Sequence, residues 1–270
     1  MLKEIMEQPE TVTQTLEGRL TTDPSVMPLP EIPFSMKELN HIQRVVLVGM
    51  GSSLHASQVG AQLIERVARI PSTAENASEF RYRDPLLNST TLVVAVGQSG
   101  ETVDTLHALD LANNKGARTL TICNIEGSEA SRLAEGTILM HSGPEVAVAS
   151  SKTFTSSLLC LYLLAVSLGQ KRGTLSNQDR AAHVEIISQL PRLLGDTLKL
   201  NENSWDKLAK RYSKFSQFLF IGRGLLEPIA REGALKLKEI SYIHAEGLPA
   251  GELKHGPIAL INPECPVVTL

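Results

Sequence analysis

Aromatic residues and cysteines are scarce in this sequence. Phe, Trp and Tyr together make up 4% of the 270 residues, and the three cysteines, Cys123, Cys160 and Cys265, lie far apart. An odd number of widely spaced cysteines indicates neither a disulfide framework nor a set of zinc ligands. We therefore expect no metal site, and a reducing, cytoplasmic location is the default expectation for these thiols.

The chain also lacks an excess of one charge, a signal peptide and a membrane-length apolar run. Its 26 basic and 29 acidic residues give a net charge of −3, so no nucleic acid and no anionic membrane is expected as a partner. The charged N-terminus has no apolar signal-peptide region. The longest apolar run, Leu158 to Leu168, is eleven residues long, too short to span a bilayer. Any phosphate site would have to be local.

Strand patterns alternate with helical patterns over the first half of the chain. Short apolar runs, several rich in β-branched residues, predict strands at 45–48, 73–77, 92–96, 119–123 and 137–140. This alternation predicts an α/β fold, a doubly wound five-stranded parallel sheet with helices on both faces. We expect the flavodoxin-like strand order 2-1-3-4-5. A helix expected at 153–168 is apolar nearly all round, which is typical of a buried helix.

A second α/β unit is expected in the last third of the chain. Its parts are a polar linker at 171–178, a helix at 181–200, a strand at 218–221, a glycine turn at 222–224 and a helix at 228–240. This unit is short for a domain and ends on an apolar strand expected at 267–270, so we expect it to be incomplete. The expected organisation is an N-terminal helical segment and connector (1–40), a first domain (41–175), and a linker helix with a partial second domain (176–270).

The segment from Gly97 to Thr102 lies between the third expected strand and a helix. Free backbone N–H groups and the positive end of the helix dipole meet at such a point, which makes it suited to an anion. Gln98, Ser99 and Thr102 add side-chain donors suited to phosphate. Glu101 carries a negative charge within the same segment, and it fits a phosphate site if its side chain points away from the anion.

Two other strand ends carry hydroxyl groups. Gly49 to Ser53 follows the first strand, and Ser150 and Ser151 follow the fifth. In the expected strand order the first and third strands are neighbours at the topological switch point, where their loops would share a crevice. One alternative is that each hydroxyl caps its own helix. A dinucleotide site is disfavoured because Leu54 stands where that fingerprint requires its third glycine.

The helix after Pro228 carries Glu232, Lys236 and Glu239 at spacings of four and three, which places them on one face. One interpretation is an exposed, salt-bridged face. The other is a carboxylate base with a lysine beside it. His255 lies in a turn next to glycine and proline, away from any periodic apolar face, which favours the second interpretation. A zinc deaminase signature near His244 is incomplete because its Cys-x-x-Cys is missing.

These motifs resemble the isomerase half of glucosamine-6-phosphate synthase, which is built from sugar-isomerase (SIS) domains. The matching segments are 77–83, 98–102, 148–155, 232–246 and 251–257. The resemblance implies fructose-6-phosphate as the ligand, with the phosphate bound by Gln98, Ser99 and Thr102 and with Ser53, Val148 and Ser150 near the sugar. It also implies that Glu239 moves a proton between C1 and C2, and that Lys236 supports the charge.

The resemblance further implies a homodimer in which His255 reaches across the interface and assists ring opening. It implies no metal and no organic cofactor. The expected activity is ketose–aldose isomerisation with amination at C2, as in hexosamine synthesis. A carboxylate placed over two adjacent carbons can carry a proton between them, which fits this chemistry.

Three departures from the family pattern leave alternatives open. Gly97 stands where the family has a further phosphate-binding serine, the glutaminase is absent from this sequence, and no lysine can be assigned to the Schiff base that the family forms with the ketose. One alternative is a stand-alone amino-sugar phosphate deaminase or isomerase. The other is a sugar-phosphate sensor without catalysis. The nitrogen source, the direction of reaction and whether Leu270 is the natural end stay open.

Overall fold

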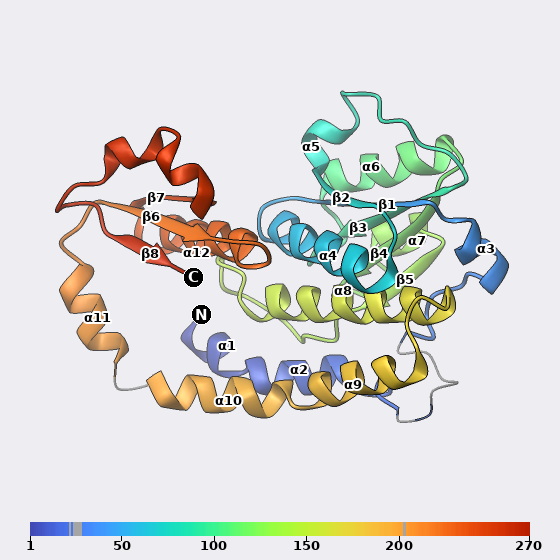
Figure 1. The fold of residues 1–270 in the computed structure, drawn as a ribbon, viewed down its shortest axis with the longest axis horizontal. Helices are drawn as coiled ribbons and strands as arrows, with labels where there is room; N and C mark the ends of the chain where they lie inside the picture. Colours follow the sequence, from blue (N-terminus) through green and yellow to red (C-terminus); the bar gives the residue numbers. More distant parts are fainter. Residues whose placement is uncertain (22, 24–28, 202–203) are drawn as a thin grey trace.

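The structure is a computed structural model that describes residues 1–21, 23, 29–201 and 204–270 (Figure 1). In chain order its elements are α1 (Leu2–Met6), α2 (Gln8–Leu16), α3 (Met36–His41), β1 (Arg44–Gly49), α4 (Ser52–Ala68), β2 (Ser72–Asn76), α5 (Ala77–Phe80), β3 (Thr91–Val96), α6 (Val103–Asn114), β4 (Arg118–Cys123), α7 (Glu129–Leu133), β5 (Gly136–Leu139), α8 (Lys152–Lys171), α9 (Asn177–Ser188), α10 (Leu190–Asn201), α11 (Trp205–Tyr212), β6 (Gln217–Gly222), α12 (Leu226–Ser241), β7 (His244–Pro249), η1 (Ala250–Lys254), η2 (Pro257–Leu260) and β8 (Val267–Thr269). Part of the connector expected before residue 40 lies outside the described residues.

The first sheet has five strands in the order β2-β1-β3-β4-β5, and every neighbouring pair is parallel. The predicted fold class and strand order are therefore confirmed. All six residues of β3 are buried. Helices cover both faces of the sheet, so a central strand needs apolar residues at every position rather than at alternate ones.

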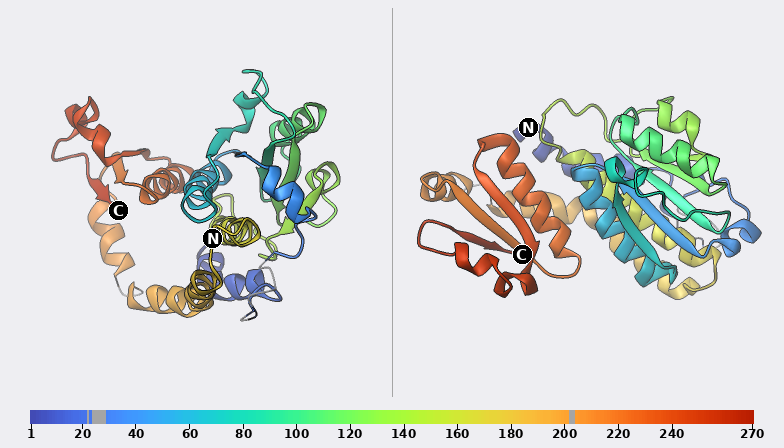
Figure 2. Two further views of the ribbon diagram at one scale, coloured as in Figure 1. Left: turned by 45° about the vertical axis from the view of Figure 1, so that its right-hand side comes forward. Right: turned by 90° about the horizontal axis from the view of Figure 1, so that it is seen from above.

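Successive residues of β1 serve two separate cores. Val45 and Leu47 pack in the core shared with α4 and α8, whereas Val46 and Val48 pack with α5 and α6 on the opposite face. This alternation follows from the two-residue period of a strand. The two helical layers are visible on either side of the sheet in Figure 2.

Helix α8 lies in the centre of the molecule, as its apolar composition predicts. It packs closely on α4, where Gly60 permits the close approach. A Cβ added at Gly60 would lie only 2.9 Å from Leu161 Cδ2 of α8. Leu163 and Leu164 have no exposed surface, and each contributes roughly 1.5–3 kcal/mol by its burial. Among the described helices α8 alone is long and apolar enough to cross a membrane. However, 72% of its apolar 18-residue stretch is buried inside the protein, as in a core helix.

The second sheet has three parallel strands in the order β7-β6-β8. Phe218 and Phe220 of β6 face α12, and Leu219 and Ile221 face η1 on the other side. The strand at 218–221, the glycine turn and the helix after it were predicted from the sequence, and β7 was not. In Figure 2 α12 lies between this sheet and the first one, while η1 and η2 lie on the outer side.

Two helices expected to be continuous are each divided in the structure. The N-terminal helix is split at Glu7 into α1 and α2, and the helix expected at 181–200 is split at Gln189 into α9 and α10. In both places a proline, Pro9 or Pro191, follows within two residues of the break. Proline is tolerated in the first turn of a helix but lacks the N–H that an interior position requires, so a new helix begins there.

Candidate functional site

Ser53 and Ser99 follow adjacent strands at the same edge of the first sheet. Strands β1 and β3 pair in parallel with Val48 opposite Ala95, Ser53 comes shortly after the end of β1, and Ser99 comes shortly after the end of β3. Because α4 and α6 leave this edge toward opposite faces, it is the topological switch point of the sheet. The two hydroxyl-bearing turns therefore share the position where ligands bind in open α/β sheets.

The loop from Gly97 to Thr102 is held in one backbone conformation. Gly100 has φ +67°, and a Cβ there would lie 2.3 Å from Ser128 Oγ, so only glycine fits. The carboxylate of Glu101 accepts a hydrogen bond from Glu129 N at 2.9 Å, at the start of α7. Its charge is thus engaged by another helix N-terminus, as a phosphate site in this loop requires.

The hydroxyl groups in these turns do not cap their helices. Thr102 is the N-cap residue of α6 but makes no side-chain cap hydrogen bond, and the N-cap of α4 is Gly51. Ser99 Oγ accepts from Glu101 N at 3.1 Å, which leaves its own proton to donate. Within the described residues, the side chains of Ser53 and Thr102 have no hydrogen-bond partner. The capping interpretation is therefore wrong, and these donors remain available to a ligand.

Helix α12 brings an ionic cluster onto the first turn of α4. Glu232 accepts from Ser52 Oγ through one carboxylate oxygen and contacts His55 Nδ1 through the other, both at 2.7 Å. Lys236 Nζ lies 3.2 Å from Glu232, 3.0 Å from Ser52 Oγ and 2.7 Å from Glu239. Glu232 is only 5% exposed. The interpretation of this stripe as an exposed, salt-bridged face is therefore wrong for Glu232.

Glu232 is held as a carboxylate despite its burial. Burial on its own would raise the pKa of Glu232, but the hydrogen bonds from His55 and Ser52 and the charge of Lys236 outweigh it, and the pKa lies below its usual value. An ionised carboxylate only accepts hydrogen bonds, so the ring proton of His55 must be on Nδ1. The result is a fixed negative charge beside Lys236 at the start of α4.

The loop before α8 presents Val148 and Ser150. Val148 is 91% exposed, and Ser150 Oγ lies 2.7 Å from Thr153 Oγ1. The first turn of α8 is occupied by the chain itself, because the Glu145 carboxylate accepts from Ser151 N at 2.8 Å and from Lys152 N at 2.9 Å. The N-terminus of α8 is therefore no free anion site, unlike that of α6.

The sequence matches the family described as the SIS domain over residues 38–167 and 212–270. The chain belongs to the SIS family. It is 43% identical to glutamine–fructose-6-phosphate aminotransferase (isomerizing) of Bacteroides thetaiotaomicron, over 100% of this chain and 44% of that protein. It is 37% identical to the C-terminal domain of glucosamine-fructose-6-phosphate aminotransferase from Francisella tularensis, with TM-score 0.94 over 100% of this chain and 74% of that one.

The resemblance to the isomerase half of such enzymes is thereby confirmed, and this SIS chain spans less than half the length of the curated relatives that it matches. Glucosamine-6-phosphate deaminase from Thermotoga maritima shares the SIS fold, with TM-score 0.75 at 24% identity over 99% of this chain and 75% of that one.

His255 is not brought to Glu239 within one SIS chain. It follows η1, which packs on the Leu219 face of β6, whereas α12 packs on the opposite face. His255 is exposed. Of the predicted catalytic residues, the structure brings Lys236 and Glu239 together and leaves His255 apart.

Ser52 and His55 of the SIS site were not predicted from the sequence. Both contact the buried Glu232, which the sequence placed on the polar stripe of its helix but not among the site residues. A signal was present, because a serine and a histidine three residues apart share one face in the first turn of α4. The partner lies 177 residues away in the chain, which no local pattern reveals.

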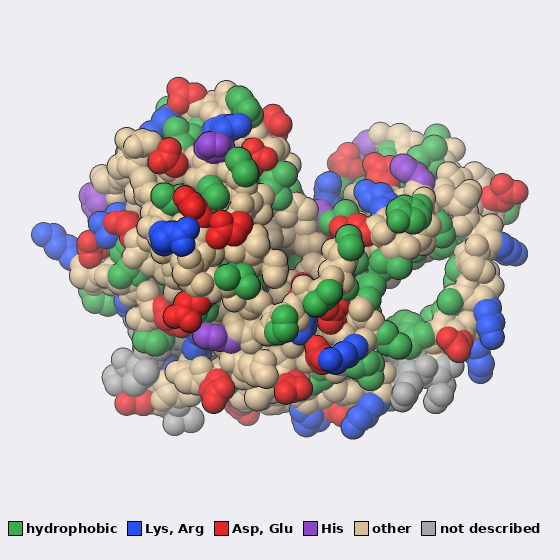
Figure 3. Space-filling view, turned by 180° about the vertical axis from the view of Figure 1, so that it is seen from behind, with side chains coloured by type: hydrophobic (Ala, Val, Ile, Leu, Met, Phe, Trp, Pro, Cys, Tyr) green, Lys and Arg blue, Asp and Glu red, His purple; other side chains and the backbone are tan. Residues whose placement is uncertain are grey.

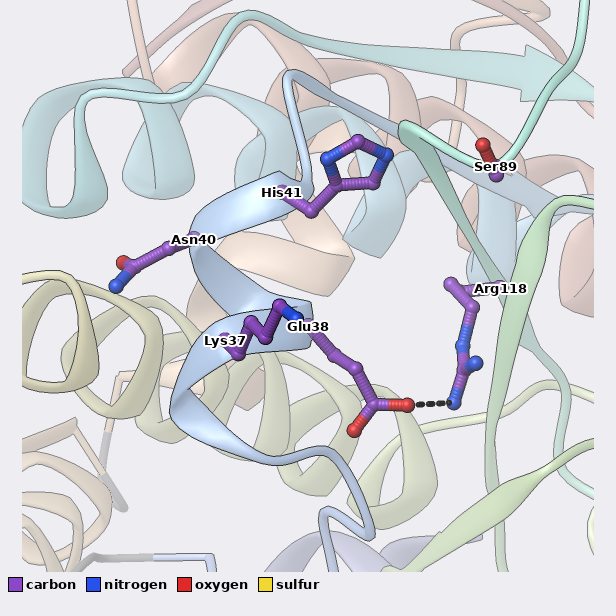
Figure 4. A pocket seen from close by; sticks show the side chains of 6 residues that line it. All are labelled: Lys37, Glu38, Asn40, His41, Ser89 and Arg118. Atoms are coloured by element: carbon purple, nitrogen blue, oxygen red, sulfur yellow. Dashed lines mark ion pairs between the residues drawn. The ribbon is translucent and has the colours of Figure 1, made fainter.

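A separate hollow of about 630 Å³ lies at the opposite edge of the sheet (Figure 4). It is lined by Lys37, Glu38, Asn40, His41, Ser89 and Arg118. The guanidinium of Arg118 is already paired with Glu38 and Glu135, each at 3.1 Å, and lies over the ring of Phe34. These contacts engage Arg118, one of the basic side chains that line the hollow. On the face drawn in Figure 3, acidic and basic side chains are intermingled rather than gathered by sign.

Proposed function

We propose that this chain is a phosphosugar enzyme that acts on fructose-6-phosphate or glucosamine-6-phosphate. The observation that carries the proposal is the meeting of two features at one sheet edge. The uncapped N-terminus of α6 offers an anion site, and α12 brings the Glu232, Lys236 and Glu239 cluster onto the first turn of α4. The names of the relatives, which act on fructose-6-phosphate, support the same substrate class.

In this proposal the phosphate binds Gln98, Ser99, Thr102 and the free N–H groups of α6, and the sugar extends toward α12. An anion at a helix N-terminus gains from both the backbone donors and the dipole. Ser53, Val148 and Ser150 line the sugar. The net charge of the chain is small, so this local field supplies the attraction.

Glu239 then acts on the carbonyl end of the ligand. Ammonia first adds to C2 of the ketose and water leaves, which gives an imine. Glu239 then removes a proton from C1 while the imine nitrogen takes up a proton from solvent, which gives an enolamine. Glu239 returns its proton to C2, the C1 hydroxyl releases its proton to solvent, and C1 becomes the aldehyde. Lys236 Nζ lies 2.7 Å from Glu239 and 3.2 Å from Glu232, which places a cation beside the carboxylate that accepts the proton. The reverse sequence of steps deaminates glucosamine-6-phosphate.

His255 contributes to this site only if a second copy of the chain supplies it. We therefore propose a homodimer in a cytoplasmic location, with His255 of one protomer beside Glu239 of its partner. Support comes from the exposed position of His255 on the far side of β6 from α12. Closed two-fold dimers are the commonest assemblies of soluble chains, and their interfaces can complete a site in this way.

The test is to incubate the protein with fructose-6-phosphate and ammonia, and separately with glucosamine-6-phosphate, and to follow the products by NMR. Conversion in either direction is the expected result, and the faster direction separates synthesis from deamination. Binding of fructose-6-phosphate without conversion would favour a sensor. If the protein neither bound nor converted either sugar phosphate, the proposal would be overturned.

A further inference from the structure

The first turns of the chain contact the loop that carries Val148 and Ser150. Glu4 of α1 is only 8% exposed, and its carboxylate accepts from Val146 N at 2.7 Å and from Ala147 N at 3.1 Å. These partners are 142 and 143 residues away in the chain. A buried carboxylate needs polar partners: Oε1 of Glu4 accepts both hydrogen bonds from the loop backbone, and Oε2 lies 3.3 Å from the amino group of Met1.

A second contact lies one residue beyond α1. Glu7 Oε2 is 3.0 Å from Nζ of Lys152, a lysine that is 5% exposed at the start of α8. The backbone hydrogen bonds from Val146 and Ala147 lower the pKa of Glu4, and the hydrogen bond from Lys152 lowers that of Glu7. Both side chains are therefore charged at neutral pH and engaged with this segment.

The far end of the loop is held by Glu145, which accepts from Ser151 N and Lys152 N. Glu4 therefore fixes the beginning of the loop and Glu145 fixes its end, while Val148 between them is 91% exposed. A loop with two fixed ends has few conformations to lose when a ligand contacts its centre.

We propose that Glu4 and Glu7 are positioning residues for the phosphosugar, holding the loop from Val146 to Ser150 in the conformation that receives the sugar. Neither touches the ligand. The inference rests on the proposed function, since it assigns the loop to the same site. It extends the site to α1, which lies more than 140 residues from this loop in the sequence and contains none of the motifs that predicted the site.

The hydrogen bonds of Glu4 are separate from the contacts that hold the N-terminal segment to the protein. Val12 and Leu16 of α2 are buried in the main core, and Thr15 Oγ1 donates to Met140 O at 2.6 Å. Removing the Glu4 carboxylate should thus release the loop and leave α2 in place.

The experiment compares Glu4→Ala and Glu4→Gln with Glu10→Ala, a control at an exposed position of the same segment. In Glu4→Ala we expect amide exchange at Val146 and Ala147 to rise at least about tenfold and fructose-6-phosphate to bind about tenfold more weakly, with the melting temperature near that of the control. Glu4→Gln keeps one acceptor oxygen and should restore part of both quantities.

The readouts separate the two hypotheses. The positioning role would be overturned if Glu4→Ala left amide exchange at Val146 and Ala147 unchanged, or raised it without weakening the binding of fructose-6-phosphate. In either case, binding of fructose-6-phosphate by the wild-type protein would still uphold the proposed function. Wild-type protein that binds no phosphosugar would overturn the proposed function, and exchange at Val146 would still report whether Glu4 holds the loop. If Glu4→Ala melts far below the control, Glu4→Gln alone decides, by the same pair of measurements.

Discussion

Glu232 Oε2 on α12 and His55 Nδ1 on α4 lie 2.7 Å apart and join the second α/β unit to the first. Glu232 is buried and His55 is partly buried. The same carboxylate accepts a hydrogen bond from Ser52 Oγ and forms an ion pair with Lys236. Because α4 begins at the carboxyl end of β1 in the first sheet, this contact fixes where α12 lies over that end of the sheet. The positions of Lys236 and Glu239 therefore depend on a carboxylate that need not contact the substrate.

Removal of this carboxylate should destabilise the protein. In Glu232→Ala the side chains of His55, Ser52 and Lys236 lose their buried acceptor, and we expect the free energy of unfolding to fall by about 3 kcal/mol. Urea denaturation measures this quantity. Lys238→Ala, on the exposed side of the same helix, should change it by less than about 0.5 kcal/mol. Equal effects of the two substitutions would contradict a structural role for the Glu232 contact.

The same carboxylate should affect how stability depends on pH. The pKa of Glu232 in the folded state lies below 4.5, the ordinary value expected in the unfolded chain, so the unfolded state binds more protons in the acid range. Its contribution is fully present above that ordinary value and is lost as the pH falls through the folded-state pKa. Glu232→Gln should therefore show a shallower fall in unfolding free energy from about pH 5 to about pH 3.

Urea titrations at a series of pH values give this slope. Glu10→Gln, at an exposed position, should keep the wild-type slope. Identical slopes for Glu232→Gln and wild type would show that the folded state leaves the proton affinity of this carboxylate unchanged.

The sequence predicted most strands well because their residues are set by burial on two faces. Both β1 and β3 contain continuous apolar runs, at 45–48 and 92–96, which a two-sided parallel sheet requires. Strand β7 was missed because it contains Gly247 and Pro249, which usually argue against a strand. The glycine is needed because a Cβ there would lie 2.4 Å from Arg231 Cα of α12, a tertiary contact that no local pattern contains.

The candidate site was predicted only where its residues follow a local sequence pattern. The loop from Gly97 to Thr102 is a local strand-to-helix signal, so its donors could be read from the sequence. The burial of Glu232 depends on α4 covering one face of α12, and spacing alone cannot tell a covered polar stripe from an exposed one.

Substitution of Ser99 tests the phosphate site. The Ser99 hydroxyl accepts from Glu101 N and has its own proton available for a ligand. In Ser99→Ala we expect fructose-6-phosphate to bind about 1–3 kcal/mol more weakly, because a charged ligand oxygen loses its donor. Calorimetric titration measures the loss. Ser89→Ala, at the opposite edge of the sheet, serves as the control, and equal affinities for the two variants would place the phosphate elsewhere.

Gly97 offers the opposite test, a gain of affinity. A Cβ added at Gly97 meets no heavy atom within 4 Å, and its φ lies outside the left-handed region. Gly97→Ser therefore fits without strain and adds a hydroxyl to the phosphate loop, so we expect binding to strengthen by about 0.5–1.5 kcal/mol. The matched variant Gly100→Ser should lose affinity and stability, since Gly100 has φ +67° and its added Cβ would clash with Ser128. Weaker binding by Gly97→Ser would argue against a phosphate at this loop.

Glu239 carries the proposed proton transfer. Glutamine has nearly the same shape but cannot accept the proton, so Glu239→Gln should bind fructose-6-phosphate with near wild-type affinity and lose turnover by at least about a hundredfold. Product formation followed by NMR gives the rate, and full activity would show that another group is the base.

Mixing this variant with His255→Ala tests where His255 acts. In a dimer whose sites combine Glu239 of one protomer with His255 of the other, each mixed dimer regains one intact site. An equal mixture that exchanges subunits should then recover about one quarter of wild-type turnover, while each variant alone stays inactive. If Glu239 and His255 acted within one chain, each site in the mixture would be formed by a single protomer. Every site would then lack either Glu239 or His255. No recovery after verified subunit exchange would therefore place His255 outside the shared site.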